Sequence, residues 1–181
     1  MAEGRLIAPD VLRQLISYNE NTGEAFWKWR DKSYFPDGRA QKIWNTRFAN
    51  QKIGRLGSGG YLYVTIFKQV YLLHRVVYAI KHGEYPQTTD HINGDKADNR
   101  AVNLRSVTNA ENGRNSKRST RNTSGHVGVG WAKADKRWWA AIKFNYKRIG
   151  LGQFKTKEEA IMARRKAEIE YGFHPNHGRA G

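Results

Sequence analysis

The chain contains no cysteine, no long apolar run and few acidic residues for its length. Without cysteine, a disulfide framework and a thiolate-bound zinc site are both excluded. No stretch approaches the roughly 20 apolar residues that a membrane-spanning helix needs. Residues 1–15 also lack the basic leader and apolar run of a secretory signal. We therefore expect an intracellular protein.

Basic residues outnumber acidic ones: 32 Lys and Arg against 16 Asp and Glu give a formal net charge of +16. Such a charge indicates a polyanionic partner, either nucleic acid or an acidic membrane surface. A membrane binder would use an amphipathic basic helix, and the sequence contains none of adequate length. The basic residues are instead interleaved with six Trp, nine Tyr and seven Phe. We expect double-stranded DNA as the partner, with no membrane and no obligate protein partner.

Periodicity and turn residues predict short helices and strands in the first half of the chain. The expected elements are a helix over 9–18, a strand over 25–29, strands over 61–67 and 70–73 joined as a hairpin at Lys68-Gln69, and a helix over 74–83 ended by Gly83. Residues 30–60 have weak periodicity, which fits a long basic loop or an irregular connector. His74 opens the second helix, where a packed, hydrogen-bonded histidine is commoner than a metal ligand.

Residues 90–112, DHINGDKADNRAVNLRSVTNAEN, combine an Asp-His pair, a turn and a series of asparagines. Asn93-Gly94 is a strong turn signal, so the chain should reverse there or shortly after. Thr108 and Glu111 have the spacing of a capping box, which places a helix start near Asn109. The segment therefore predicts a strand, a loop, a short strand and a helix.

These residue types suit metal-assisted hydrolysis of a phosphodiester. A divalent cation stabilises the phosphoryl and leaving oxygens, and a neutral imidazole can deprotonate the attacking water. Asp90 offers a carboxylate and Asn112 an amide oxygen, which are donor types that Mg²⁺ prefers. His91 is the candidate base because its ordinary pKa lies near neutrality. Adjacent Asp-His pairs are common and Asn-rich loops often only cap turns, so spacing alone leaves a structural role open.

Two geometric conditions apply to such a site. Neighbouring residues of a regular strand point to opposite faces, so Asp90 and His91 can serve one site only if the strand ends or bends there. On the following helix, Asn109 and Asn115 share a face with Asn112, so the ligand could lie one turn away.

The same segment closely resembles the motif of HNH homing-type endonucleases, the ββα-metal group often encoded by phages and mobile introns. The resemblance covers roughly residues 55–116, including LHRVVYA upstream, and is similar to a subgroup with a His-Asn-Asn pattern and one metal ion. It implies that Asp90 and Asn112 bind one Mg²⁺ or Mn²⁺ per active site and that His91 is the general base. It also implies that Asn103, the middle residue of the motif, holds the loop together.

The last third of the chain predicts a second small module. Residues 113–124 contain no acidic or large apolar residue and form a basic linker that can follow phosphates. Strands are expected over 126–132, 137–144 and 147–154, followed by a helix over 160–171, opened by a capping box at Thr156 and Glu159, with Ala160, Ala163, Ala167 and Ile169 available for packing. The side chains expected to bind DNA are Arg114, Lys117, Arg118, Arg121, Trp131, Lys133, Lys136, Arg137, Trp138, Lys143, Lys147 and Arg148.

Residues 123–172 resemble the Apetala/ethylene-response-factor DNA-binding domain, which is also found fused to phage HNH nucleases. The resemblance implies that Arg and Trp side chains on the sheet contact DNA. Gly130 and Ala132 stand near positions where the plant proteins carry arginine, so a sequence preference is not transferred. At least one of the three sheet tryptophans is expected to pack in the core instead.

We therefore expect an α+β protein with a ββα-metal HNH nuclease core followed by a three-stranded antiparallel sheet packed on one helix. The expected domains are an N-terminal region over 1–54, the nuclease core over 55–116, a basic linker over 117–124, a DNA-binding domain over 125–173 and a tail over 174–181. The predicted function is a metal-dependent DNA endonuclease, a homing-type or phage nickase in the cytoplasm of a bacterial host, acting as a monomer or a DNA-bound dimer. The alternative is a non-catalytic DNA-binding or regulatory protein on a retained HNH scaffold.

Overall fold

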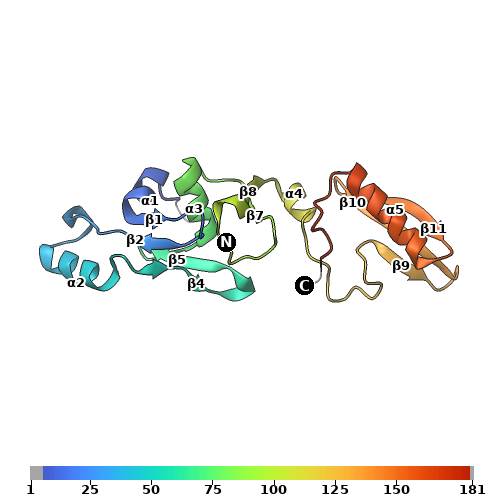
Figure 1. Ribbon diagram of the computed structural model, residues 1–181, viewed down its shortest axis with the longest axis horizontal. Helices are drawn as coiled ribbons and strands as arrows, with labels where there is room; N and C mark the ends of the chain where they lie inside the picture. The colour runs from blue at the N-terminus through green and yellow to red at the C-terminus, as the bar shows by residue number, and fades with distance from the viewer. Residues whose placement is uncertain (1–5, 180–181) are drawn as a thin grey trace. The chain divides into compact units, whose positions relative to one another are not determined.

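The computed structural model describes residues 6–179 and divides the chain into two compact units, Met1–Val107 and Thr108–Gly181 (Figure 1). Both units combine helices with small antiparallel sheets, so the expected α+β class is confirmed. Within residues 6–179, no helix is both long and apolar enough to cross a membrane. The first five residues of the expected N-terminal region and the last two of the expected tail lie outside the described residues.

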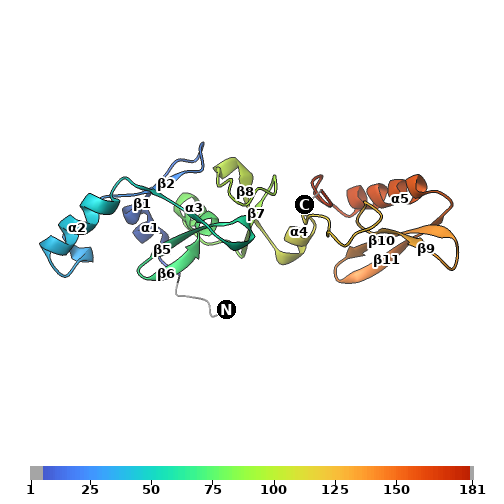
Figure 2. The same ribbon diagram turned by 90° about the horizontal axis from the view of Figure 1, so that it is seen from below.

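The first unit is built from short helices and sheets. Its elements are α1 (Pro9–Leu15), β1 (Ile16–Tyr18), β2 (Ala25–Trp27), a 3₁₀ turn (Lys32–Tyr34), α2 (Gly38–Phe48), β3 (Lys52–Ile53), β4 (Arg55–Leu56), a 3₁₀ turn (Ser58–Gly60), β5 (Leu62–Ile66), β6 (Gln69–Leu72), α3 (Leu73–His82), β7 (Thr88–His91), a 3₁₀ turn (Ala101–Asn103) and β8 (Leu104–Val107). The strands pair in the orders β1-β2-β3, β4-β5-β6 and β7-β8. Figure 2 shows β5 beside β6 and β7 beside β8.

The expected basic loop or irregular connector over 30–60 is wrong, because α2 occupies its centre. The Asp37 side chain caps this helix by accepting a hydrogen bond from the Ala40 amide at 2.7 Å. Trp44 and Phe48, four residues apart, pack together with ring centres 5.3 Å apart. A capped start and one aromatic face therefore form a helix where the overall periodicity is weak.

The other expected elements of this unit are present with shifted ends. α1 ends at Leu15, not at residue 18, because Ile16–Tyr18 pairs with Ala25–Trp27 as a strand. The hairpin turn is Phe67-Lys68, one residue earlier than expected, and both residues have positive φ, as a tight two-residue hairpin requires. α3 ends at Gly83, which adopts the left-handed conformation as expected.

α3 packs on α1 and on the β5-β6 hairpin around one apolar core. The buried members of that core include Leu12, Leu15, Ile66, Val76 and Val77. α3 leads directly into β7 through a short connector, so this core positions the start of the Asp-His strand.

The second unit contains the expected three strands and helix. Its elements are α4 (Asn109–Gly113), β9 (Val129–Ala132), β10 (Arg137–Phe144), β11 (Lys147–Phe154) and α5 (Lys157–Glu170), with the strands in the antiparallel order β11-β10-β9. Both expected capping boxes, at Thr108 and at Thr156, are formed. Trp138 packs against the small core around Val129, Ala140 and Ala160, so the expectation that one tryptophan is a core residue is confirmed.

The expectation that Ile169 of α5 packs in the core is wrong. Ile169 is 82% exposed, whereas Arg164 is buried in its place. The Arg164 guanidinium donates to the Ala141 carbonyl at 2.8 Å and pairs with Glu168 at 2.8 Å, so its burial is compensated. Residues at the C-terminal end also fold back onto this unit, since Arg179 donates to Asn115 Oδ1 at 3.0 Å.

Candidate active site

The Asp-His pair lies at the end of β7, which pairs antiparallel with β8. The register places Asp90 opposite Arg105 and His91 opposite Leu104. The chain turns directly after His91, whose carbonyl accepts a hydrogen bond from the Gly94 amide at 2.9 Å. β7 therefore ends at His91, but Asp90 and His91 are consecutive residues of its regular ladder, so the use of both in one site stays a prediction.

Asn103 closes the loop between β7 and β8 from the inside. Its side-chain oxygen accepts from the Asn93 amide at 2.9 Å, and its side-chain nitrogen donates to the Asp98 carbonyl at 2.8 Å. Its own carbonyl accepts from the Ile92 amide at 2.9 Å. Because Asn103 is 5% exposed, these bonds are sheltered from water. One buried amide side chain thus joins the beginning and end of the loop that follows His91.

Asp98 is a second organiser of this loop. Its carboxylate accepts from the Arg100 Nε and Nη2 groups at 2.8 and 2.6 Å and from the Asn93 side chain at 2.8 Å. The Arg100 hydrogen bond is the main reason that the pKa of Asp98 falls to about 2, with the Arg100 amide and Asn93 adding to it against the effect of burial. The carboxylate is therefore ionised at neutral pH.

His91 is buried and held by a neighbouring amide. It is 4% exposed, and its Nε2 lies 3.2 Å from Asn99 Oδ1. A tautomer protonated at Nε2 donates to this oxygen and keeps its basic lone pair at Nδ1. Burial lowers the pKa of His91, while the Asn99 hydrogen bond and the nearby carboxylates, Asp90 first among them, oppose that lowering. The imidazole is therefore neutral at neutral pH, the state that a general base requires.

Two rings pack against His91 from elsewhere in the unit. His74, at the start of α3, lies edge-on to His91 with ring centres 5.0 Å apart, and Tyr61 lies 6.0 Å from it. Burial, followed by the nearby His91 and Arg75, lowers the pKa of His74 to about 3. His74 is thus a neutral, packed residue beside the candidate base. The sequence indicated packing for His74 but not this neighbour.

The Asp90 carboxylate is 8% exposed and ion-paired across the hairpin. Its Oδ2 accepts from Arg105 Nε at 3.0 Å and from Nη2 at 2.7 Å. Its negative charge also contributes to raising the pKa of Tyr61, after burial, which is the main cause. Among residues 6–179, no group of three or more His, Asp or Glu side chains is placed to hold a metal ion. Asp90 is therefore a buried carboxylate paired with Arg105, and its assignment as a metal ligand stays a prediction.

Asn112 lies on the short helix α4 of the second unit and is exposed. The capping box between Thr108 and Glu111 fixes the start of this helix. Asn115, one of the alternative ligands, is buried and its side-chain oxygen accepts a hydrogen bond from Arg179. This engagement favours Asn112 over Asn115, and the assignment of Asn112 as a metal ligand stays a prediction.

Comparison with known families bears directly on this segment. Residues 71–114, about a quarter of the chain, match a family model described as HNH endonuclease. They form an HNH endonuclease domain. The matched range contains His74, Asp90, His91, Asn103 and Asn112. No curated protein and no solved structure matches the chain. The HNH domain implies a nuclease with DNA as its substrate, and HNH nucleases generally use a divalent metal ion.

Outside the HNH domain, the two faces of the β9-β10-β11 sheet differ. Trp138 faces α5 and its core, and Trp131 packs against it with ring centres 5.4 Å apart. Trp139, the next residue of β10, lies on the opposite face over Gly130, where an added Cβ would come within 2.4 Å of the indole. The Arg148 guanidinium stacks on Trp139 at 4.9 Å. Trp139 was one of the three sheet tryptophans but was not among the side chains expected to bind DNA, because alternation alone does not say which face of the sheet is buried.

The basic residues expected to bind DNA divide into two groups. Arg114 and Arg118 are engaged inside the second unit, by the Tyr171 carbonyl at 3.3 Å and by the Gly125 carbonyl. The others are exposed: Lys117, Arg121, Lys133, Lys136, Arg137, Lys143, Lys147 and Arg148. The exposed group is therefore the part of the expected set that is accessible to a phosphate backbone.

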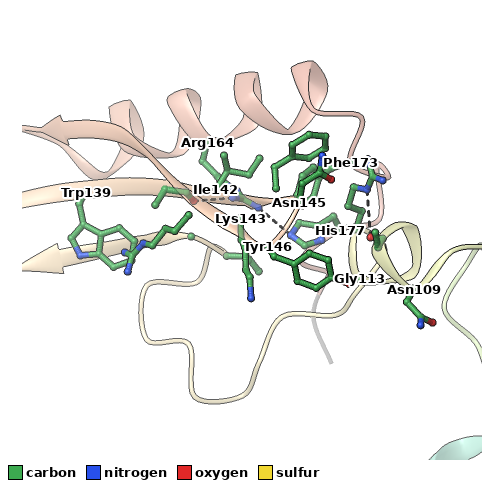
Figure 3. Close-up of a pocket in the computed structure, with 17 residues that line it drawn as sticks. Asn109, Gly113, Trp139, Ile142, Lys143, Asn145, Tyr146, Arg164, Phe173 and His177 are labelled. Carbon is green, nitrogen blue, oxygen red and sulfur yellow. Dashed lines mark hydrogen bonds between the residues drawn. The ribbon is translucent and has the colours of Figure 1, made fainter.

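A cavity of about 470 Å³ lies beside β10 in the same unit (Figure 3). Trp139, Lys143, Tyr146 and Phe173 are among the residues that line it. Arg164 also contributes to its wall, and its Nη2 lies 3.2 Å from His177 Nε2. Aromatic and basic side chains thus meet at one hollow of the second unit.

Proposed function

We propose that the protein is a divalent-metal-dependent DNA endonuclease whose active site is built on Asp90, His91 and Asn112. The observation that carries the proposal is the buried His91, held by Asn99 at the end of β7 within residues that match the HNH endonuclease family. A buried, neutral imidazole with one nitrogen engaged by an amide is suited to removing a proton from water. The Asn103 loop contacts keep that imidazole in place.

The donor chemistry fits Mg²⁺ or Mn²⁺. Asp90 supplies a carboxylate oxygen and Asn112 an amide oxygen, and both ions accept such oxygen ligands together with water and substrate phosphate. When bound, the ion would polarise the phosphoryl group and stabilise the leaving oxygen.

The protein residues would share the remaining work. His91 would accept the proton of the attacking water at Nδ1, and Asn99 would orient the ring. Arg105 would fix the Asp90 carboxylate through its two hydrogen bonds to Oδ2. Asn103 would act as a positioning residue, because its side chain contacts only the loop groups of Asn93 and Asp98.

The second unit would recognise DNA through the open face of its sheet. This part of the proposal draws on the resemblance of residues 123–172 to ethylene-response-factor domains. It is supported by the exposed cations on this unit and by Trp139 with Arg148 on the face opposite α5. With one catalytic His91 per chain, a monomer would cut one strand, as in a homing-type or phage nickase.

The proposal can be tested by incubating supercoiled plasmid with the protein in Mg²⁺, in Mn²⁺ and in EDTA. We expect nicked circles only with a divalent ion, and no nicking by His91→Ala, while DNA binding in EDTA is unchanged. Normal cutting by His91→Ala would exclude the assigned base. No metal-dependent nicking by the parent at any concentration would favour a non-catalytic DNA-binding protein.

A further inference from the structure

The first unit contains a cavity of about 590 Å³ that the nuclease chemistry does not explain. Its wall includes Trp27, Arg30, Trp44, Phe48, Phe67 and Lys68. Both views place α2, which carries two of these residues, at the end of the first unit away from β7 and β8 (Figures 1 and 2). The cavity is therefore separate from Asp90 and His91.

Arg30 is fixed in the wall of this cavity. Its guanidinium carbon lies 3.9 Å from the ring centre of Trp44 and 4.5 Å from that of Trp27. Asn45 holds its backbone: the Arg30 amide donates to Asn45 Oδ1, and the Arg30 carbonyl accepts from Asn45 Nδ2, each at 2.9 Å. Packing therefore determines where the cation lies before any ligand binds.

Among residues 6–179, this buried cation has no acidic partner. Arg30 is 8% exposed, and within residues 6–179 it forms no ion pair and its Nε makes no hydrogen bond. Burial lowers its pKa to about 10, which still leaves it protonated at neutral pH. A buried guanidinium whose Nε has no acceptor is unfavourable, and the stacking on two indoles offsets only part of that. An anion entering the cavity would supply the opposite charge that Arg30 lacks among residues 6–179.

We propose that the Arg30 cavity binds a phosphate of the DNA substrate, away from the bond that is cut. A planar guanidinium forms paired hydrogen bonds with phosphate oxygens. Exposed Lys68 and Arg55 add positive charge to the lining, and the rings of Trp44 and Phe48 offer surfaces on which a base can stack. The inference rests on the proposed DNA endonuclease function, since DNA supplies the phosphate.

The test compares Arg30→Met with the parent in a duplex-binding assay by fluorescence anisotropy, in EDTA so that no cleavage occurs. We expect affinity to fall by about tenfold, the value of a hydrogen bond to a charged group. The plot of log K against log salt should also become shallower by about 0.9, because one phosphate contact is lost. Arg13→Met is the control: it removes the same charge, but Arg13 is already paired with Asp10 at 2.7 Å. It should bind as the parent does.

Equal affinity and equal salt slope for Arg30→Met and the parent would overturn the inference. A parent that binds no duplex would instead reject the proposed function. If Arg30→Met does not fold, Arg30→Lys replaces it; loss of the planar fork should still weaken binding, and parental affinity would count against the cavity.

Inorganic phosphate distinguishes the two sources of this ligand. If the ligand is a phosphate of DNA, millimolar inorganic phosphate should shift the thermal midpoint of neither the parent nor Arg30→Met. The two proteins should still differ in their affinity for duplex DNA. Stabilisation of the parent alone by phosphate, with equal duplex binding by both proteins, would overturn the assignment to DNA.

Discussion

The side-chain oxygen of Asn99 lies 3.2 Å from Nε2 of His91, and both residues are almost completely buried. The Asn99 carbonyl in turn accepts a hydrogen bond from the Tyr18 hydroxyl at 2.8 Å. The candidate base is thus connected through one asparagine to β1, a strand distant in sequence. This arrangement holds the ring of His91 through its Nε2 atom.

Replacing Asn99 by alanine should lower the rate of DNA nicking by about 10- to 100-fold, because His91 loses the acceptor that sets its tautomer and orientation. Duplex affinity in EDTA should not change. The measurement is a single-turnover nicking rate on supercoiled plasmid. Val102→Ala, at a residue 79% exposed in the same loop, is the control and should cut like the parent. A parental rate for Asn99→Ala would show that His91 needs no such partner.

Asp98 should make the stability of the first unit sensitive to acid. Its folded-state pKa of about 2 lies below the ordinary value of about 4. The contribution of Asp98 to the stability of the first unit is therefore fully present above pH 4 and is lost as the pH falls through about 2. We expect the thermal midpoint, followed by circular dichroism, to fall more steeply between pH 4 and 2 in the parent than in Asp98→Asn. Parallel curves would contradict the role given to this carboxylate.

Features that follow rules acting locally in sequence were predictable. The capping boxes at Thr108 and Thr156 each depend on two residues three apart, and both form. The contact between Asn99 and His91 was not predictable, because it depends on how the loop closes. The other asparagines of the loop carry the same side chain, so the sequence does not show which of them contacts His91. α2 was missed for a similar reason. The ring of Trp44 stacks on Arg30, which precedes the helix, so the helical segment alone does not reveal this contact.

The Arg105 cation, which fixes the Asp90 carboxylate through Oδ2, should also lower the affinity of that carboxylate for a metal ion. Arg105→Met removes the cation that pairs with the Asp90 carboxylate, and Asp90 is only 8% exposed. This loss should lower the free energy of unfolding by about 2 kcal/mol in EDTA. Mn²⁺ should then raise the thermal midpoint of the variant by more than it raises that of the parent. Equal shifts in the two proteins would argue that Asp90 does not bind the ion.

The metal ligand on α4 can be separated from its neighbour by a matched pair. Asn112→Ala should abolish metal-dependent nicking with little change in stability, because Asn112 is exposed. Asn115→Ala should instead lower the unfolding midpoint while retaining metal dependence, since Asn115 is buried and accepts from Arg179 at 3.0 Å. Nicking rates at a series of Mg²⁺ concentrations, together with thermal unfolding, give both readouts. The reverse pattern would move the ligand one turn along the chain.

Replacing each of the two adjacent tryptophans of β10 by alanine should change a different property of the protein. Trp138→Ala removes a ring packed on the core of Val129 and Ala160, so the second unit should lose about 3 kcal/mol of stability. Trp139→Ala removes a ring from the face opposite α5, so the protein should stay folded but bind duplex DNA about tenfold more weakly. Thermal unfolding and anisotropy in EDTA measure the two effects. If Trp139→Ala bound DNA like the parent, the open face of the sheet would not be the recognition surface.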